Sequence, residues 1–276
     1  MPVDESVSRI DEISKMKRMK IIIAEPYRHL ECDIRALPRL LAEGKGEFVH
    51  NGRNQLIRFT FQGVPVMVKR FKRANPVQQI AYTFFRKTKA ERAYLFAGEY
   101  RRRGIDTPHE VAYIEQREHG LFTTGYFVSL ACPDPAVFPM LVPVEKYNRQ
   151  LAGELSAEIA RMHQAGILHG DLNFGNFLYH EEDGHFRFTV VDINRSAFTR
   201  KPLTDAVYLK NLSTMTTRVD LFRFMADEYI RLLHPEEEAR GIKARIMRYW
   251  EAEQKKQRRK HRFKQWFKGG CRAKKE

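Results

Sequence analysis

The sequence contains few cysteines, no long apolar run and no secretory signal. Its three cysteines, Cys32, Cys132 and Cys271, are far apart and lack the paired spacing of a zinc site or a disulfide framework, so we expect reduced thiols. The longest apolar runs, such as residues 125–132, are much shorter than the roughly 18 residues that a membrane-spanning helix needs. The N-terminus mixes acidic and basic residues without an apolar segment, so we expect a cytoplasmic protein.

Glycine and proline are also scarce, with 16 and 12 residues among 276, which excludes a collagen-like chain and a flexible linker. Hydrophobic residues make up 43% of the sequence, enough to bury a core, so we expect one large domain or two small lobes. The formal net charge is +15, and residues 255–276 supply most of it with eleven Lys or Arg residues and one acid. The basic excess therefore lies mainly in one C-terminal segment.

The first half of the chain is rich in strand patterns. Residues 1–18 are polar and predict a mobile leader, and a β-branched run from Met19 predicts the first ordered segment. Residues 46–72 alternate with period two around two turns, which predicts a meander of three antiparallel strands. One long or two short helices fit residues 77–103, and residues 108–130 predict two more strands. We therefore expect an antiparallel sheet of about five strands with a helix.

The second half is dominated by helical periodicity. A proline-rich stretch disfavours regular structure at residues 132–139 and suggests a lobe boundary, and residues 151–165 predict a helix that ends at Gly166. A loop and a two-stranded hairpin follow, and helices resume from about Asp205. The predicted class is α+β, with four parts: a leader at 1–18, an N-lobe at 19–132, a mainly helical C-lobe at 133–254 and a basic aromatic tail at 255–276.

Three polar residues carry the spacing of a phosphoryl-transfer site. Asp171 and Asn176 lie five residues apart in the sequence HGDLNFGN, and Asp192 follows the next apolar strand. Phosphoryl transfer needs a carboxylate that orients and deprotonates the attacking hydroxyl, and oxygen ligands for Mg²⁺. Asp171 suits the first task, whereas Asn176 and Asp192 can supply oxygen ligands to the metal.

A lysine upstream completes the order of residues found in kinases. Lys69 lies on a predicted strand with Met67 and Phe71 on its own face, so its ammonium could reach nucleotide phosphates. Taken alone, such a lysine is most often solvent-exposed, and His169 alone would be a structural hydrogen-bonding residue. The combination of a lysine on a strand, a loop after a helix and a second aspartate after an apolar strand favours a kinase over that ordinary interpretation.

These segments resemble the protein-kinase-like superfamily and, within it, the lipopolysaccharide core kinases, the Kdo and heptose kinase family. The similar stretches include ARMHQAGILHGDLNFGNFLY and FTVVDINRSAF and together extend from about Met19 to about Phe224. The most specific part is residues 163–198. The resemblance implies a bilobal protein-kinase-like fold with ATP between the lobes. It also implies Lys69 on the α and β phosphates, Asp171 as catalytic base, and Asn176 with Asp192 on Mg²⁺.

The sequence departs from the kinase pattern at several positions. Residues 44–54 contain three glycines but no G-x-G-x-x-G, and Ala93 stands near the place of the helix glutamate that pairs with the strand lysine, with Glu91 close by. Asp192 is followed by Ile-Asn instead of Phe-Gly, and no A-P-E segment follows, which disfavours a phosphorylated activation loop. Asn173 replaces the lysine of protein serine/threonine kinases, which agrees better with kinases of sugars.

The tail interleaves aromatic residues, Phe263, Trp266 and Phe267, with basic ones, a composition typical of a segment that lies on an anionic membrane. A solvated extension is the ordinary alternative, and we consider nucleic acid a less favoured partner. The leading hypothesis is ATP- and Mg²⁺-dependent phosphorylation of a lipid-linked sugar, Kdo or heptose, at the cytoplasmic face of the inner membrane. The alternatives are a protein serine/threonine kinase and a nucleotide-binding pseudokinase that acts as a scaffold.

Overall fold

The computed structural model describes residues 18–200, 205–234 and 236–270, with side chains in the last helix described up to residue 263. The chain forms two compact units, one of Met1–Arg102 with Thr107–Pro133 and one of Arg103–Asp106 with Asp134–Glu276. The expected leader, except Arg18, and Cys271 lie outside the described residues. The class is α+β as predicted, with an antiparallel sheet in the first unit and mostly helices in the second.

The first unit contains a six-stranded antiparallel sheet, one strand more than the sequence predicted. The strand order is β1-β5-β6-β4-β3-β2. The additional strand is the β-branched run near Met19, which pairs with β5 so that Ile22 lies opposite Tyr113. The predicted meander and the two later strands are confirmed. The strands are β1 (Arg18–Ile23), β2 (Glu47–Asn51), β3 (Gln55–Phe61), β4 (Val64–Arg70), β5 (Glu110–Glu118) and β6 (Leu121–Leu130).

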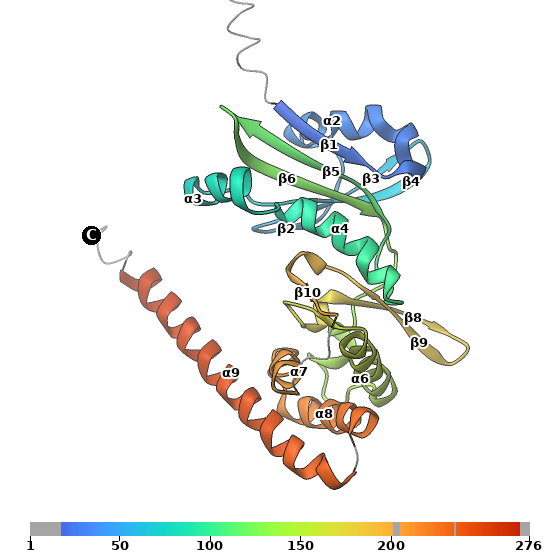
Figure 1. Cartoon of the computed structure of the whole chain (residues 1–276), viewed down its shortest axis with the longest axis vertical. Helices are drawn as coiled ribbons and strands as arrows, with labels where there is room; N and C mark the ends of the chain where they lie inside the picture. The colour runs from blue at the N-terminus through green and yellow to red at the C-terminus, as the bar shows by residue number, and fades with distance from the viewer. Residues whose placement is uncertain (1–17, 201–204, 235, 271–276) are drawn as a thin grey trace, which may run out of the picture. The chain divides into compact units, whose positions relative to one another are not determined.

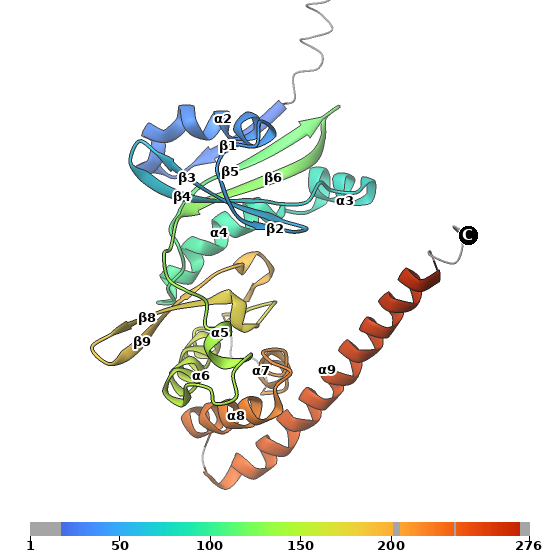
Figure 2. The same cartoon turned by 180° about the vertical axis from the view of Figure 1, so that it is seen from behind.

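Helices cover both faces of this sheet (Figures 1 and 2). The 3-10 turn η1 (Glu25–Leu30) and α2 (Glu31–Ala42) lie on one face, where Ile34 and Leu37 pack with Val66 and Val68 in a fully buried core. Helix α4 (Lys89–Arg102) lies on the other face, so close that a Cβ on Gly125 would be 3.0 Å from Ala90 Cβ. Strand β4, which carries Lys69, is thereby held between two packed layers.

The predicted helical interval 77–103 consists of separate helical pieces. Helix α3 (Pro76–Ile80) runs directly into the π-helical segment η2 (Ala81–Phe85), and α4 begins only at Lys89. Asn75 caps α3, since its side chain accepts from Gln78 N and Gln78 returns a bond to the Asn75 backbone. The expectation of two short helices rather than one long one is therefore the correct one.

The second unit is built around α6, which confirms the helix predicted at residues 151–165. Asn148 caps its start, and Gly166 follows its end with φ +70°, a conformation that side chains with a Cβ rarely adopt. The other elements are α5 (Phe138–Leu141), α6 (Arg149–Gln164), β7 (Ile167–Leu168), η3 (Phe174–Asn176), β8 (Phe177–Glu182), β9 (His185–Val190), η4 (Ile193–Arg195), β10 (Ala197–Phe198), α7 (Asp205–Leu212), α8 (Val219–Leu233) and α9 (Glu236–Gly270).

Two short strands fix the start of the loop at residues 169–176. Strand β7 pairs with β10, and the Thr199 N–H donates to the Gly166 carbonyl (2.9 Å). The Arg103 guanidinium donates to three backbone carbonyls, those of Ala165, Gly166 and Thr199, at 2.6, 3.1 and 2.9 Å. The end of α6 and the chain after η4 are therefore tied together directly beside the segment that carries His169.

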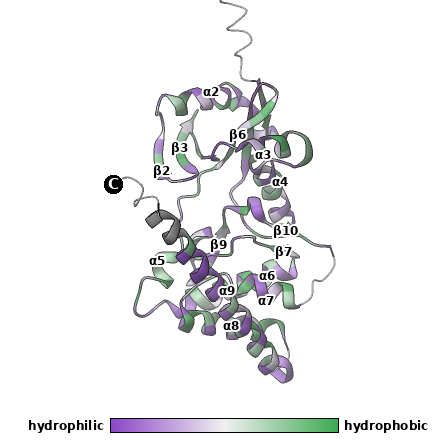
Figure 3. Ribbon diagram, turned by 90° about the vertical axis from the view of Figure 1, so that its left-hand side faces the viewer, coloured by the Kyte–Doolittle hydropathy of each residue, from purple (hydrophilic) through white to green (hydrophobic). Residues whose placement is uncertain are grey.

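The basic tail continues α9 as one helix to Gly270 instead of forming an element of its own. The first part of α9 is packed: Ile242 and Ile246 are buried, and the Trp250 indole stacks on Phe222 and donates to the Thr216 carbonyl (2.9 Å). From Lys255 to Phe263 every side chain is exposed, and Figure 3 colours much of α9 as hydrophilic. Within the described ranges, no helix is long and apolar enough to cross a membrane.

Candidate active site

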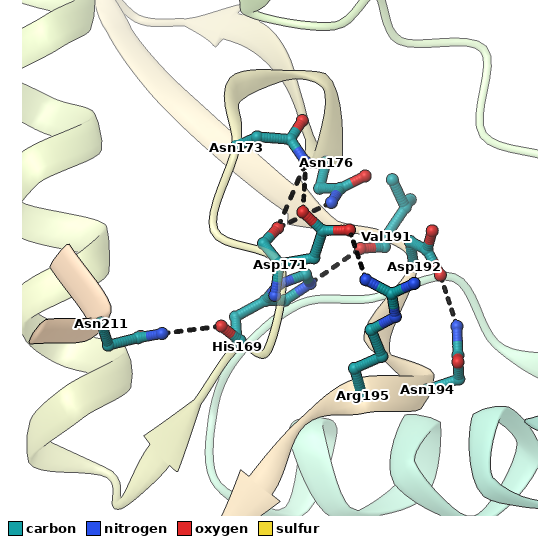
Figure 4. A network of polar contacts seen from close by, with 9 residues as sticks. All are labelled: His169, Asp171, Asn173, Asn176, Val191, Asp192, Asn194, Arg195 and Asn211. Carbon is teal, nitrogen blue, oxygen red and sulfur yellow. Dashed lines mark hydrogen bonds and ion pairs between the residues drawn. The ribbon is translucent and has the colours of Figure 1, made fainter. Parts of the chain in front are cut away.

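The structure brings Asp171, Asn176 and Asp192 together within the second unit (Figure 4). Residues 169–176, here called the catalytic loop, connect β7 with β8, and Asp192 lies just after β9. Strands β8 and β9 form a hairpin with Phe177 opposite Val190, and the Val191 N–H donates to the Asn176 carbonyl (2.9 Å). The pairing of this hairpin is what places the second aspartate beside the loop.

His169 links the loop to the segment that carries Asp192. Its ring is fully buried, Nδ1 accepts from the Asp171 backbone N–H (3.1 Å), and Nε2 donates to the Val191 carbonyl (3.0 Å). Because Nδ1 accepts, the proton of the neutral ring resides on Nε2. Burial lowers the pKa of His169 below its usual value, which keeps the ring neutral. His169 is therefore a structural residue of the site.

Two side chains hold the Asp171 carboxylate, one on each oxygen. Asn173 Nδ2 donates to Oδ1 (2.9 Å), and Arg195 Nη1 donates to Oδ2 (3.1 Å). The Asp171 side chain remains 40% exposed, so an incoming hydroxyl could reach it. A carboxylate that is oriented yet accessible has the properties of a general base.

Asn176 presents an oxygen because its amide nitrogen is already used. Its Nδ2 donates to the Asp171 backbone carbonyl (2.8 Å), which leaves Oδ1 directed away from that bond, on the side of the loop where Asp192 lies (Figure 4). This orientation suits a hard divalent cation, which prefers oxygen ligands. The predicted role of Asn176 as a metal ligand therefore agrees with its hydrogen bonding.

Asp192 lies in a left-handed backbone conformation, with φ 56° and ψ 38°, at the start of η4. Only glycine adopts this region freely, although Asp and Asn tolerate it better than other residues. The Asn194 side chain donates to Asp192 Oδ1 and orients the carboxylate. Strain of this kind in a loop that joins a strand to a functional segment is commonly retained for function.

The oxygen donors of Asn176 and Asp192 suit Mg²⁺, a cation that also takes phosphate and water oxygens as ligands. Among the described residues, no group of three or more His, Cys, Asp or Glu side chains is arranged to hold a metal by itself. Asn176 and Asp192 contribute one amide oxygen and one carboxylate, and Mg²⁺ in kinases typically uses few protein ligands together with substrate phosphates.

Steric crowding by Arg195 explains why a glycine stands between His169 and Asp171. A Cβ at this position would lie 2.8 Å from the Arg195 Cβ and would also collide with the Arg195 backbone carbonyl. Since a backbone carbonyl cannot move aside like the end of a flexible side chain, only glycine fits without displacing η4. The glycine therefore allows Arg195 to approach and donate to Asp171.

A buried polar chain supports the loop from behind, and the sequence did not indicate it. Asn211 Nδ2 on α7 donates to the His169 carbonyl (2.8 Å), and Asn211 Oδ1 lies 3.1 Å from His163 Nε2 on α6. His163 Nδ1 in turn lies 2.7 Å from the Tyr229 hydroxyl on α8. A chain of hydrogen bonds from three helices therefore ends, through Asn211, on one backbone carbonyl of the catalytic loop.

Sequence reasoning also missed Arg195 and Asn194. An arginine three residues after Asp192 and an asparagine two residues after it are visible in the sequence, so their proximity to the site was a usable signal. Asn211 and His163 carried no such signal, since their contacts span 42 and 48 residues, respectively.

Lys69, described within the first unit, lies on the face of the sheet that α4 covers. It stands between Leu56 and Phe127 in the strand register, is half-buried, and has its Nζ 5.6 Å from the centre of the Phe71 ring. Ala93 is buried on α4, and Glu91 forms an ion pair with Lys87 (3.6 Å). Position 93 therefore holds no carboxylate, as the sequence indicates.

The comparisons with known proteins agree with this geometry. A family model described as the lipopolysaccharide kinase (Kdo/WaaP) family matches residues 66–234, a range that contains Lys69, Asp171, Asn176 and Asp192. A solved structure described as WaaP in complex with acyl carrier protein is similar to this chain with a TM-score of 0.56 and 18% identity, over 84% of this chain and 98% of that one. No curated protein matches. The structural similarity supports the predicted kinase-like fold, and the family match confirms the resemblance found in the sequence.

Proposed function

Since this chain belongs to the lipopolysaccharide kinase (Kdo/WaaP) family and is therefore a kinase, we propose that it transfers the γ-phosphoryl group of ATP, with Mg²⁺, to a sugar hydroxyl of the lipopolysaccharide inner core. The acceptor is a Kdo or a heptose residue that is linked to lipid. The observation that carries the proposal is the Asp171 carboxylate, held on both oxygens by Asn173 and Arg195 while 40% of the side chain stays exposed.

Asp171 acts as the catalytic base in this proposal. Its carboxylate orients the acceptor hydroxyl and takes its proton as the acceptor oxygen bonds to the γ-phosphorus and the bond to the β-phosphate oxygen breaks. Asn173 and Arg195 keep the carboxylate in one orientation, so the hydroxyl meets an acceptor that is already positioned. Positioning matters because the protein contributes little covalent chemistry to phosphoryl transfer.

Asn176 and Asp192 are the residues that would hold Mg²⁺, through the amide oxygen and the carboxylate. The cation supplies charge neutralisation for the triphosphate when bound. Asn194 orients the Asp192 carboxylate, and His169 donates to the carbonyl of Val191, the residue directly before Asp192. Lys69 is proposed to contact the α and β phosphates, a role supported by its half-buried position among apolar neighbours on β4.

A radiolabel experiment separates this function from its two alternatives. Purified protein is incubated with γ-labelled ATP, Mg²⁺ and lipopolysaccharide core from cells that lack this gene, and label is measured in lipid and in protein. Label in the sugar of the lipid fraction supports the proposal, label in serine or threonine supports a protein kinase, and no transfer together with nucleotide binding supports a scaffold. Asn173 in place of lysine argues against a protein kinase. The presence of Asp171, Asn176 and Asp192 argues against an inactive scaffold.

The Asp171→Asn variant tests the role of the base directly. It is expected to lower kcat by on the order of 10² to 10⁴ with nucleotide binding largely retained, the usual contribution of a positioned base. The matched control is Asp183→Asn in the β8–β9 turn, where φ is 52° and asparagine is equally tolerated. Turnover equal to that of the parent in Asp171→Asn would remove Asp171 from the mechanism.

We propose that the basic tail places the kinase at the cytoplasmic face of the inner membrane. The tail continues α9 to Gly270, and its side chains from Lys255 to Phe263 are exposed, so the basic groups are available to anionic headgroups. Each basic residue near such a surface contributes about 1 kcal/mol, and a lipid-linked acceptor would make this location useful. Replacing Lys255, Lys256, Arg258 and Arg259 with glutamine should weaken sedimentation with phosphatidylglycerol vesicles. Loss of an RNA gel shift instead would assign the tail to nucleic acid.

A further inference from the structure

A stripe of exposed apolar side chains runs along α3 and η2, far in sequence from the catalytic loop. Val77, Ile80, Phe84 and Phe85 are 77%, 49%, 67% and 79% exposed. Their spacing of three, four and one residues places them on one side of a helical segment. We refer to these four residues as the α3 stripe, and Figure 3 shows hydrophobic residues in this part of the first unit.

The opposite side of the same segment is tied to the sheet, so the α3 stripe is held facing outward. Thr83 Oγ1 accepts from the Phe122 N–H of β6 (2.9 Å), and the Tyr82 ring packs edge-on against the Phe122 ring at 5.5 Å. The π-helical turn leads into Arg86, whose N–H donates to the Ala81 carbonyl (2.8 Å). Phe84 and Phe85 pack against each other at 6.2 Å. The aromatic pair is therefore presented by a fixed scaffold.

The chain segment that carries the α3 stripe is basic. Between residues 72 and 90 the sequence contains five Lys or Arg residues and no acid. Lys72 and Arg73 precede α3, whereas Arg86 and Lys87 follow η2, and all four are exposed. Arg73 is paired with Glu118 and Lys87 with Glu91, so these two bases are partly neutralised locally. Basic side chains thus flank both ends of an apolar stripe.

We propose that the α3 stripe docks on an anionic lipid bilayer, with the four apolar side chains in the interfacial layer and the flanking bases at the headgroups. Exposed aromatics beside lysine and arginine are the composition of interfacial helices. A folded protein partner is less well matched, because a stable interface buries about 800 Å² on each side and four side chains on a convex helix offer much less. This surface is separate from the basic tail, and only its use in reaching a lipid-linked acceptor rests on the proposed function.

Vesicle sedimentation with the full chain tests the proposal. Vesicles of phosphatidylglycerol with phosphatidylcholine are compared with vesicles of phosphatidylcholine alone, for the parent and for Phe84→Ser/Phe85→Ser. The double variant is expected to lose about tenfold or more of its partition onto the anionic vesicles, since membrane binding scales with the apolar area inserted. Phe84→Leu/Phe85→Leu should retain most of the binding, because it keeps apolar area at the same positions.

The control removes exposed apolar area from another part of the same unit. Phe48 and Val49 on β2 are 42% and 50% exposed, and Phe48→Ser/Val49→Ser should sediment with vesicles like the parent. Equal thermal unfolding midpoints would establish that all variants are folded. Sedimentation of Phe84→Ser/Phe85→Ser equal to the parent overturns the proposal. The proposal is also overturned if the parent is a dimer and the double variant is a monomer. It is overturned likewise if the double variant loses binding to an acidic protein while its vesicle binding is unchanged.

An activity measurement keeps this proposal distinct from the proposed function. With the acceptor dispersed in detergent, Phe84→Ser/Phe85→Ser is expected to transfer phosphate as fast as the parent, because no catalytic residue is altered. With the acceptor in anionic vesicles, its rate should fall in parallel with vesicle binding. If the parent transfers no phosphate to any core acceptor, the proposed function fails while the sedimentation result still decides the fate of the α3 stripe.

Discussion

Arg195 Nη1 lies 3.1 Å from Asp171 Oδ2, opposite the Asn173 amide that donates to Oδ1 at 2.9 Å. The two donors come from different segments, one from the catalytic loop and one from η4 after Asp192. The orientation of the proposed base is therefore set jointly by the loop and by the segment that carries the proposed metal ligand. A shift of η4 would move the carboxylate as well as Asp192.

Arg195→Ala is expected to lower kcat by about tenfold, because one of the two donors that orient Asp171 is lost at a partly exposed site. Steady-state kinetics with the core acceptor measure the effect. Arg187→Ala is the control, since Arg187 forms a more exposed ion pair with Glu182 (3.3 Å) on the hairpin, outside the candidate site. Equal rates for Arg195→Ala and Arg187→Ala would mean that Asn173 alone positions the carboxylate.

Asp192→Asn is expected to abolish the stabilisation by ATP that depends on Mg²⁺. Asparagine tolerates the left-handed backbone of residue 192, so the variant removes the charge with little change in conformation. At a hundredfold excess over Kd, ligand binding stabilises a protein by about 2.7 kcal/mol, or a Tm shift of the order of 5 °C. Thermal shift assays with ATP, with and without Mg²⁺, measure this difference. An unchanged Mg²⁺-dependent shift in Asp192→Asn would argue against its role as ligand.

Gly170→Ala and Gly153→Ala should have opposite effects on stability. A Cβ at residue 170 collides with the backbone of Arg195, so Gly170→Ala is expected to reduce the free energy of unfolding by about 1–3 kcal/mol and to lower kcat strongly. Gly153 lies within α6 with nothing within 4 Å of the added Cβ, so its substitution should stabilise by about 0.5–1 kcal/mol. Urea unfolding measures both. Gly170→Ala with parental stability and kcat would contradict the steric argument.

Much of the fold followed from local patterns. Alternation around turns predicted β2 to β4, and the apolar face of α6 with Gly166 after it predicted that helix. The sequence did not predict α2, which carries Pro38 within its length, and packing of Ile34 and Leu37 on the sheet compensates for that weak local signal. The sixth strand was also missed, because only tertiary pairing with β5 joins the run near Met19 to the sheet.

In the candidate site, too, local patterns indicated some residues and gave no sign of others. Asp171, Asn176 and Asp192 were found because their spacing along the chain is fixed by a loop and a hairpin, both of which are local structures. Asn211 and His163 act through bonds between helices that are distant in sequence, and nothing in a local pattern indicates such a bond. Local spacing therefore indicated which residues of the proposed site lie together, whereas it gave no sign of the distant residues Asn211 and His163 that support the loop.

We expect His163 to make the second unit sensitive to acid. Burial lowers its pKa from 6.5 to about 4, and both ring nitrogens lie within hydrogen-bond distance of Tyr229 and Asn211. Between pH 6.5 and pH 4 the unfolded chain binds a proton that the folded chain does not, so acidification favours unfolding. The contribution of this residue to stability is complete above pH 6.5 and is lost as the pH falls toward 4. Burial shifts the pKa of His169 in the same direction.

Replacing His163 with glutamine should reduce this pH dependence. The parent is expected to lose about 2 kcal/mol more than His163→Gln between pH 7 and pH 5, the amount that follows from a pKa lowered from 6.5 to about 4. Urea unfolding at the two pH values, followed by a signal from the second unit such as Trp250 fluorescence, measures the difference. His180→Gln, at a half-exposed position on β8, should keep the parental slope. Parallel slopes for the parent and His163→Gln would show that the buried imidazole does not control the acid sensitivity of this unit.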